Sequence, residues 1–160
     1  MSNNAQEIPI RREELPELLF IGLPVIVSFK HGDFNKIGQI KEVFMQRRNE
    51  IPNVVDPDHY YAPWYNYEVM FTYFYVMQVS SLERIPEGMM GFAVPGHTYL
   101  RAQYDGLYPF DPDPYAELQR YREAQDLKQN QSAMIFEKYA FVNEGMNGRM
   151  IVDVYGPIES

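Results

Sequence analysis

The sequence predicts an α+β fold made of two consecutive strand-helix-strand-strand modules. Each half of the chain has strand patterns around one helical pattern, and His31-Gly32 and Asp105-Gly106 each precede a helix. We expect the modules to pair their sheets with pseudo-twofold symmetry, with both helices behind and a central ligand cleft between the halves. Residues 1–160 would form a single domain, with module one at about 15–82 and module two at about 90–159.

The first module opens with an apolar strand at residues 19–29 and continues into a helix at 34–49. Asp33 is positioned to cap that helix. Its apolar face is formed by residues at helical spacing: Phe34, Ile37, Ile40 and Phe44. A proline-containing loop then leads to an aromatic strand or hairpin region at 64–80, where no glycine or proline marks the strand boundaries.

The second module contains one helix, at residues 114–128, because Asp113 is a good N-cap and Pro114 a good first helical residue. Residues 144–148 form a glycine-containing hairpin loop between the last two strands. The three strands of this module are expected at residues 91–104, 134–143 and 150–157.

Composition excludes several kinds of site. The absence of cysteine excludes disulfides, thiolate nucleophiles and cysteine-based zinc sites. The three histidines, His31, His59 and His97, lack metal-ligand spacing. We therefore expect no metal and no cofactor. The sequence also shows no Ser-His-Asp elbow and no phosphate-binding glycine loop.

Charge and hydropathy indicate where the protein acts. The formal net charge is −8, and no basic stripe is visible, so we expect no direct binding to nucleic acid. Residues 1–14 lack the apolar region of a signal peptide. The longest apolar stretch, residues 18–29, is about half as long as a membrane span requires. These features predict a cytoplasmic protein that does not bind membranes.

Glu137 is the leading candidate for a functional residue. In the predicted strand around it, Glu137 alternates with Ile135, Tyr139 and Phe141, which places a carboxylate on an aromatic face. Burying an ionised carboxylate is costly unless a partner supplies a charge or a hydrogen bond. Either a cation, a proton or a polar group of a ligand provides that partner, or the strand register is shifted and Glu137 faces water.

Several motifs resemble the gyrase-inhibitor-like small-molecule-binding family. Phe136-Glu137-Lys138-Tyr139 resembles its Phe-Glu-x-Tyr signature, and Asp153–Ile158 resembles its closing strand. Ile85–Met89 and Val94–Tyr99 resemble its central linker and the strand that follows. This family includes the effector-binding domains of AraC- and MerR-type transcription activators. The resemblance runs from about Leu19 to Ile158 and implies the same tandem fold with a central cleft.

The resemblance also implies a set of ligand-binding residues. Glu137 would attract cationic, aromatic, drug-like ligands, because a carboxylate supplies charge while flat cations stack on rings. The aromatic lining would consist of Tyr139, Tyr155, Trp64, Tyr65 and Tyr67. Tyr139 and Tyr155 are equally compatible with an ordinary core, and Trp64 with a plug that closes the sheet. Gln78 stands where the family often has glutamate, which predicts a less acidic pocket.

These features favour a stand-alone small-molecule-binding protein without a DNA-binding domain. We expect a binder of aromatic or cationic compounds rather than an enzyme, with any protein partner unknown. One alternative is a small-molecule hydrolase with Glu137 as general base and Tyr139 or Tyr155 as proton donor. Another is an interaction protein of the topoisomerase-inhibitor type.

Overall fold

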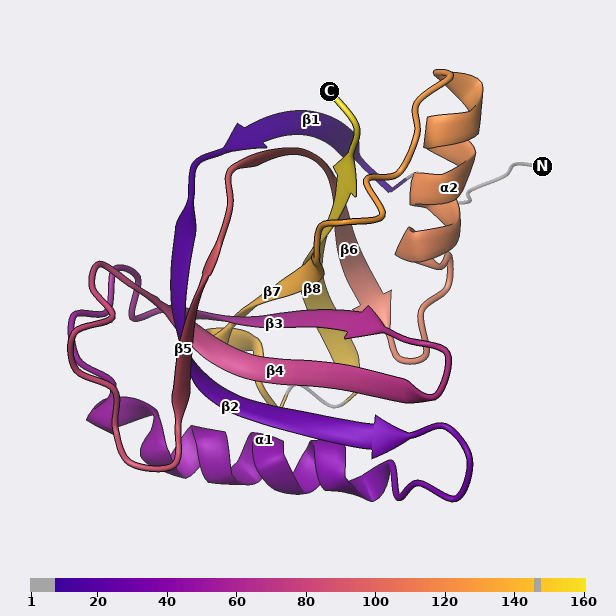
Figure 1. The fold of residues 1–160 in the computed structure, drawn as a ribbon. Helices are drawn as coiled ribbons and strands as arrows, with labels where there is room; N and C mark the ends of the chain where they lie inside the picture. The colour runs from indigo at the N-terminus through magenta and orange to yellow at the C-terminus, as the bar shows by residue number, and fades with distance from the viewer. Residues whose placement is uncertain (1–7, 146–147) are drawn as a thin grey trace.

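The computed structural model describes residues 8–145 and 148–160 and confirms the α+β class (Figure 1). These residues form one eight-stranded antiparallel sheet with two α-helices, α1 (Asn35–Arg47) and α2 (Pro114–Ala124). The strands are β1 (Ile10–Leu15), β2 (Leu18–Ser28), β3 (His59–Asn66), β4 (Met70–Val79), β5 (Met90–Val94), β6 (His97–Leu107), β7 (Ile135–Ala140) and β8 (Arg149–Ile158). Short 3-10 turns follow α1 at Arg48–Glu50 and β7 at Phe141–Asn143. None of the described helices is long and apolar enough to cross a membrane.

The strands lie in the order β1-β6-β8-β7-β3-β4-β2-β5. Within each half, the third strand of the strand-helix-strand-strand unit lies between the first and the second, as β2-β4-β3 and as β6-β8-β7. The halves meet where β3 pairs with β7, and Ala62 stands opposite Glu137 in that register. The middle of β7 is therefore the middle of the sheet.

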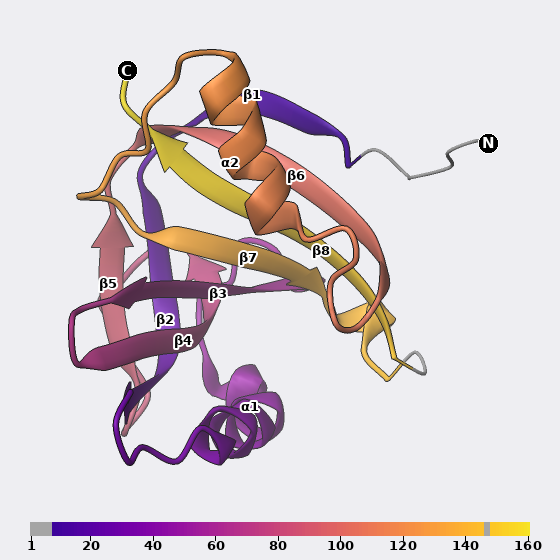
Figure 2. The same cartoon turned by 90° about the vertical axis from the view of Figure 1, so that its right-hand side faces the viewer.

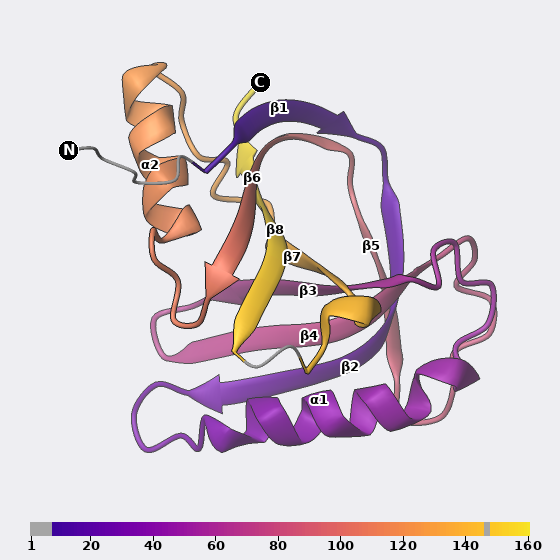
Figure 3. The same cartoon turned by 180° about the vertical axis from the view of Figure 1, so that it is seen from behind.

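The sheet curves strongly, because each edge strand, β1 and β5, turns through a corner into the next strand of the chain (Figures 1 and 3). β1 leads into β2 through Pro16-Glu17, and β5 leads into β6 through Pro95-Gly96. Since β1 pairs with β6 and β2 with β5, both corners bend together. A Cβ at Gly96 would lie 3.0 Å from the Leu15 carbonyl oxygen. The prediction of a single strand at 91–104 is therefore wrong, because this corner divides the segment into β5 and β6.

Both helices pack on the same face of the sheet, which we call the helix face (Figure 2). Phe44 of α1 packs with Tyr60 of β3, and Leu118 of α2 packs with Val154 of β8. Val154 lies opposite Glu137, so both contacts are made on the side of the sheet that carries this carboxylate. The other face holds a separate aromatic core: Phe20, Tyr61, Phe74, Tyr99, Phe136 and Tyr155.

The helix boundaries differ from the predictions at three ends. α1 begins at Asn35, so Phe34 rather than Asp33 is the cap residue, although the Asp33 carboxylate accepts the Asn35 N–H at 2.9 Å. α1 ends at Arg47, two residues before the predicted end, where the chain tightens into a 3-10 turn. The cap of α2 is as predicted, since Asp113 accepts the Tyr115 N–H at 2.9 Å. α2 ends at Ala124 rather than 128, and Asp126 beyond it has a left-handed backbone with φ of 55°.

The strand boundaries differ most in the aromatic region. Residues 64–80 belong to a hairpin of β3 and β4, and β3 starts as early as His59 and includes Pro63. β7 is shorter than predicted, because the chain turns into a 3-10 helix at Phe141. β1 was not predicted from its polar sequence, and its partner is β6. Part of the predicted hairpin loop, residues 146–147, lies outside the described residues.

Candidate ligand-binding site

Glu137 lies in the middle of the central strand pair and is buried, with 7% of its surface exposed. β7 places it between Ala62 of β3 and Val154 of β8. The predicted alternation is confirmed, since Phe136 faces the opposite core while Glu137 and Tyr139 share the helix face. The alternative in which Glu137 points into water is therefore wrong.

Three tyrosine hydroxyls donate hydrogen bonds to the Glu137 carboxylate. Tyr73 of β4 donates to Oε1 at 2.6 Å, and Tyr139 of β7 donates to the same oxygen at 2.7 Å. Tyr115, in the first turn of α2, donates to Oε2. Among the described residues, no arginine or lysine forms an ion pair with Glu137. Neutral phenols from both halves of the chain thus surround the carboxylate.

Burial disfavours ionisation of these tyrosines further. Removal from water raises the pKa of Tyr73, Tyr115 and Tyr139 well above that of a free phenol, and the nearby negative charge of Glu137 raises it further. The three hydroxyls are therefore fixed as donors at physiological pH. They stabilise the anion through charge-assisted hydrogen bonds, which are stronger than bonds between neutral groups.

Trp64 belongs to the same cluster through Tyr115. Its indole Nε1 donates to the Tyr115 hydroxyl oxygen at 3.1 Å, and it is half-buried. The register of β3 and β4 places Trp64 opposite Tyr73, so both rings share the helix face. Phe71 lies beside the indole, with ring centroids 5.7 Å apart. Trp64 is thus linked to Glu137 through one tyrosine, Tyr115, which accepts from the indole and donates to the carboxylate.

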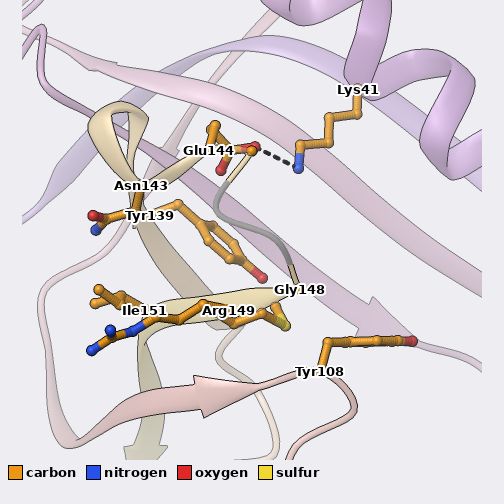
Figure 4. Close-up of a pocket in the computed structure, with 10 residues that line it drawn as sticks. Lys41, Tyr108, Tyr139, Asn143, Glu144, Gly148, Arg149 and Ile151 are labelled. Atoms are coloured by element: carbon orange, nitrogen blue, oxygen red, sulfur yellow. Dashed lines mark ion pairs between the residues drawn. The ribbon is translucent and has the colours of Figure 1, made fainter.

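A cavity of about 460 Å³ opens next to this cluster (Figure 4). It lies between α1 and the connection from β7 to β8, and it is lined by Lys41, Tyr108, Tyr139, Asn143, Glu144, Gly145, Gly148, Arg149, Met150 and Ile151. Tyr139 is shared, because its ring lines the cavity while its hydroxyl binds Glu137. Glu137 itself does not line the cavity, so Tyr139 separates the buried carboxylate from the open space.

The structure does not bring the other predicted aromatics to this cluster. Tyr155 lies on the opposite face, where its ring stacks on Phe136 with centroids 4.7 Å apart and 21° between planes. Tyr65 and Tyr67 are exposed near the β3–β4 turn, where their rings contact each other edge to face. The predicted site residues that come together are Glu137, Tyr139 and Trp64.

Three residues of the site were missed from the sequence. Tyr73 becomes recognisable only once the β3–β4 register pairs it with Trp64. Tyr115 lies within the helix predicted at 114–128, but no sequence signal indicates that its hydroxyl reaches β7. Glu144 was assigned to a loop, yet it lines the cavity. Gln78, which was expected to make the pocket less acidic, lies on the face of the sheet opposite Glu137, near the Tyr61 hydroxyl.

Comparison with known proteins identifies one family. The family model for Cass2, described as integron-associated effector binding protein, matches residues 11–158. No curated protein matches the sequence.

Solved structures with the same fold carry different descriptions. The EcmrR C-terminal domain superposes with a TM-score of 0.73 at 16% identity, covering 97% of this chain and 99% of that one. SAV2435, solved bound to tetraphenylphosphonium, has a TM-score of 0.67 at 14% identity, with 96% and 95% covered. A structure described as a hydrolase from Listeria innocua has a TM-score of 0.60 at 10% identity, with 98% and 94% covered. At these identities the likeness establishes the fold alone.

Proposed function

The chain belongs to the family of integron-associated effector-binding proteins, and on that premise we propose that it binds small aromatic cations. The family match and the shared architecture confirm the gyrase-inhibitor-like resemblance and the α+β class of the fold. The function rests on a single observation, which is the environment of Glu137.

Glu137 is a buried carboxylate whose hydrogen-bond donors in the described structure are three neutral phenols. Hydrogen bonds offset part of the cost of removing the anion from water, but they leave its charge uncompensated. A cationic ligand would supply the missing charge in a region of low dielectric, where charge attraction is stronger than in water. The surrounding rings would add stacking and cation–π contacts.

We infer that the ligand enters the cleft between the two halves on the helix face. The repeated strand order supports a pseudo-twofold axis between β3 and β7, near Ala62 and Glu137. The cavity beside Tyr139 supports a route toward that centre. Residues 1–160 act in this proposal as one effector-binding domain, with modules at about 15–82 and 90–159. Roles in binding for Tyr155, Tyr65 and Tyr67 stay predictions.

The tetraphenylphosphonium held by SAV2435 supports the ligand class, since it is a cation surrounded by aromatic rings. Entry of such a ligand would require rearrangement around Tyr139, because this residue separates Glu137 from the cavity. A ligand cation would then take the place of the Tyr139 hydroxyl beside the carboxylate. Tyr73 and Tyr115 would keep the carboxylate oriented while Tyr139 moves.

The test compares the cation N-methyl-4-phenylpyridinium with its neutral counterpart, 4-phenylpyridine. Binding of each compound is measured at mildly alkaline pH by calorimetry and by Trp64 fluorescence. We expect wild type to bind the cation with a dissociation constant in the micromolar range, about −8 kcal/mol. Glu137→Gln should weaken cation binding about tenfold and neutral binding less than about twofold. Glu68→Gln, which makes the same change at an exposed position, serves as the control. Equal losses for both ligands would reject the electrostatic role of Glu137.

A hydrolase is the second candidate, because Tyr139 joins the cavity to a carboxylate. In that case Glu137 would act as general base and the Tyr139 phenol as proton donor to the leaving group. The Listeria structure described as a hydrolase supports keeping this candidate. Product accumulating beyond one equivalent from a reactive ester, and lost in Tyr139→Phe, would favour it over simple binding.

A further inference from the structure

Besides the buried Glu137, a second carboxylate, Glu144, lines the cavity and already has a cationic partner. The Glu144 Oε1 atom lies 2.8 Å from the Lys41 Nζ atom, and the Tyr60 hydroxyl donates to Oε2 at 2.7 Å. Lys41 and Glu144 both line the cavity, as Figure 4 shows. Lys41 comes from α1 in the first half, whereas Glu144 follows β7 in the second half. The ion pair therefore spans the two halves of the chain.

A stacked tyrosine pair connects this carboxylate to Glu137. Tyr60 and Tyr139 stand directly opposite each other on β3 and β7, and their rings stack with centroids 5.1 Å apart and 13° between planes. The Tyr60 hydroxyl binds Glu144, and the Tyr139 hydroxyl binds Glu137. The hydroxyls of two stacked rings thus each hold one carboxylate: Tyr139 holds the buried Glu137, and Tyr60 holds Glu144 at the cavity.

We propose that Glu144 is an outer cation subsite, that Lys41 is its intramolecular counter-ion, and that the site selects aromatic compounds carrying two positive charges. This rests on the proposed function, because one charge would go to Glu137 and the second to Glu144. The ligand's second charge takes the place of the Lys41 ammonium group. A neutral compound gains nothing from that exchange.

The exchange is feasible because the two partners are held differently. Glu144 stays anchored by Tyr60 after Lys41 leaves. The Lys41 side chain is about one-third exposed, at 36%, so its ammonium group can be hydrated on release. An ion pair this close to solvent contributes little to stability, so displacing it carries a small penalty. Arg149, the other cation at the cavity, pairs with Asp105 at 2.8 Å and does not compete for Glu144.

The experiment uses two probes with one ring skeleton: the monocation N-methyl-4-phenylpyridinium and the dication N,N′-dimethyl-4,4′-bipyridinium. Wild type should bind the dication more tightly than the monocation. Lys41→Met should strengthen dication binding about fivefold, the equivalent of one exposed ion pair. Glu144→Gln should remove the preference for the dication, and Lys41→Met should have no further effect in that background. Lys36→Met, on the same helix but exposed, controls for a general change in charge.

Lysine acetylation gives an independent readout in the wild-type protein. Saturation with the dication should increase the acetylation rate of Lys41, measured by peptide mass spectrometry, while exposed Lys36 stays unchanged. If the monocation binds through Glu137 but Glu144→Gln leaves the dication preference intact, the outer subsite is rejected and the proposed function stands. An equal gain from Lys41→Met and Lys36→Met would also reject it. If neither probe binds to any variant, both proposals fail.

Discussion

Replacing Glu137 with leucine tests whether the carboxylate organises the centre of the fold. Leucine is close in size to glutamate and apolar, but it cannot accept a hydrogen bond. The change therefore leaves the hydroxyls of Tyr73, Tyr115 and Tyr139 without their acceptor, while Tyr115 still accepts from Trp64. Each buried donor left without a partner costs about 1–3 kcal/mol.

The expected net loss is about 3 kcal/mol. Three unpaired tyrosine hydroxyls at about 1 kcal/mol each give about 3 kcal/mol. Any larger penalty at one of them is offset because leucine buries an apolar side chain where the wild type buries a charge. For a chain of this length such a loss lowers the melting temperature by about 6–12 °C. Glu137→Gln should lose less, because its amide oxygen still accepts from Tyr73 and Tyr139 at the position of Oε1.

The assay is urea unfolding at neutral pH, followed by Trp64 fluorescence and by circular dichroism. Trp64 is the single tryptophan and donates a hydrogen bond to Tyr115 within the cluster, so its emission reports local and global loss of structure. Tyr73→Phe and Tyr139→Phe each remove one donor together with its need for an acceptor, and should cost about 1 kcal/mol or less. An unfolding free energy for Glu137→Leu within about 0.5 kcal/mol of wild type, or above it, would refute the reasoning.

Three further perturbations have defined outcomes. Gly22→Ala should prevent folding or lower stability severely, since a Cβ there would lie 1.9 Å from the Tyr75 carbonyl oxygen; a soluble variant with wild-type circular dichroism would contradict this. Asp113→Ala should cost about 1 kcal/mol in urea unfolding, because it removes the acceptor of the Tyr115 N–H, whereas Asp113→Asn should restore most of the loss. Burial raises the pKa of Tyr99 to about 12, so its contribution is complete below the unfolded-state pKa of about 10 and is lost as pH rises toward the folded value. Unfolding free energies measured from about pH 9 to about 11 should fall by up to about 1.4 kcal/mol per unit for each such tyrosine, and a flat profile would disprove the coupling.

Local patterns in the sequence were sufficient to predict the α+β class of the fold and to identify Glu137 as the central carboxylate. Helical spacing and the Asp113 cap located α1 and α2 to within a few residues, because these signals act over one or two turns. Strand alternation placed Glu137 and Tyr139 on one face, because successive side chains of any strand point to opposite sides. Neither inference needed knowledge of a distant residue.

The tertiary structure alone decided which residues share a face with Glu137 across strands. Tyr155 carries the same aromatic signal as Tyr139, but the β7–β8 register sets it opposite Phe136, one residue out of step with the acid. Tyr73 and Tyr115 reach Glu137 from 64 and 22 residues away, through strand pairing and the docking of α2. Strand register and helix docking depend on the packing of the whole sheet. A shift of one residue in the register of a strand would turn all of its side chains to the other face of the sheet. For this reason the sequence could identify the carboxylate, while the folded chain determined its hydrogen-bond donors and the second acid beside the cavity.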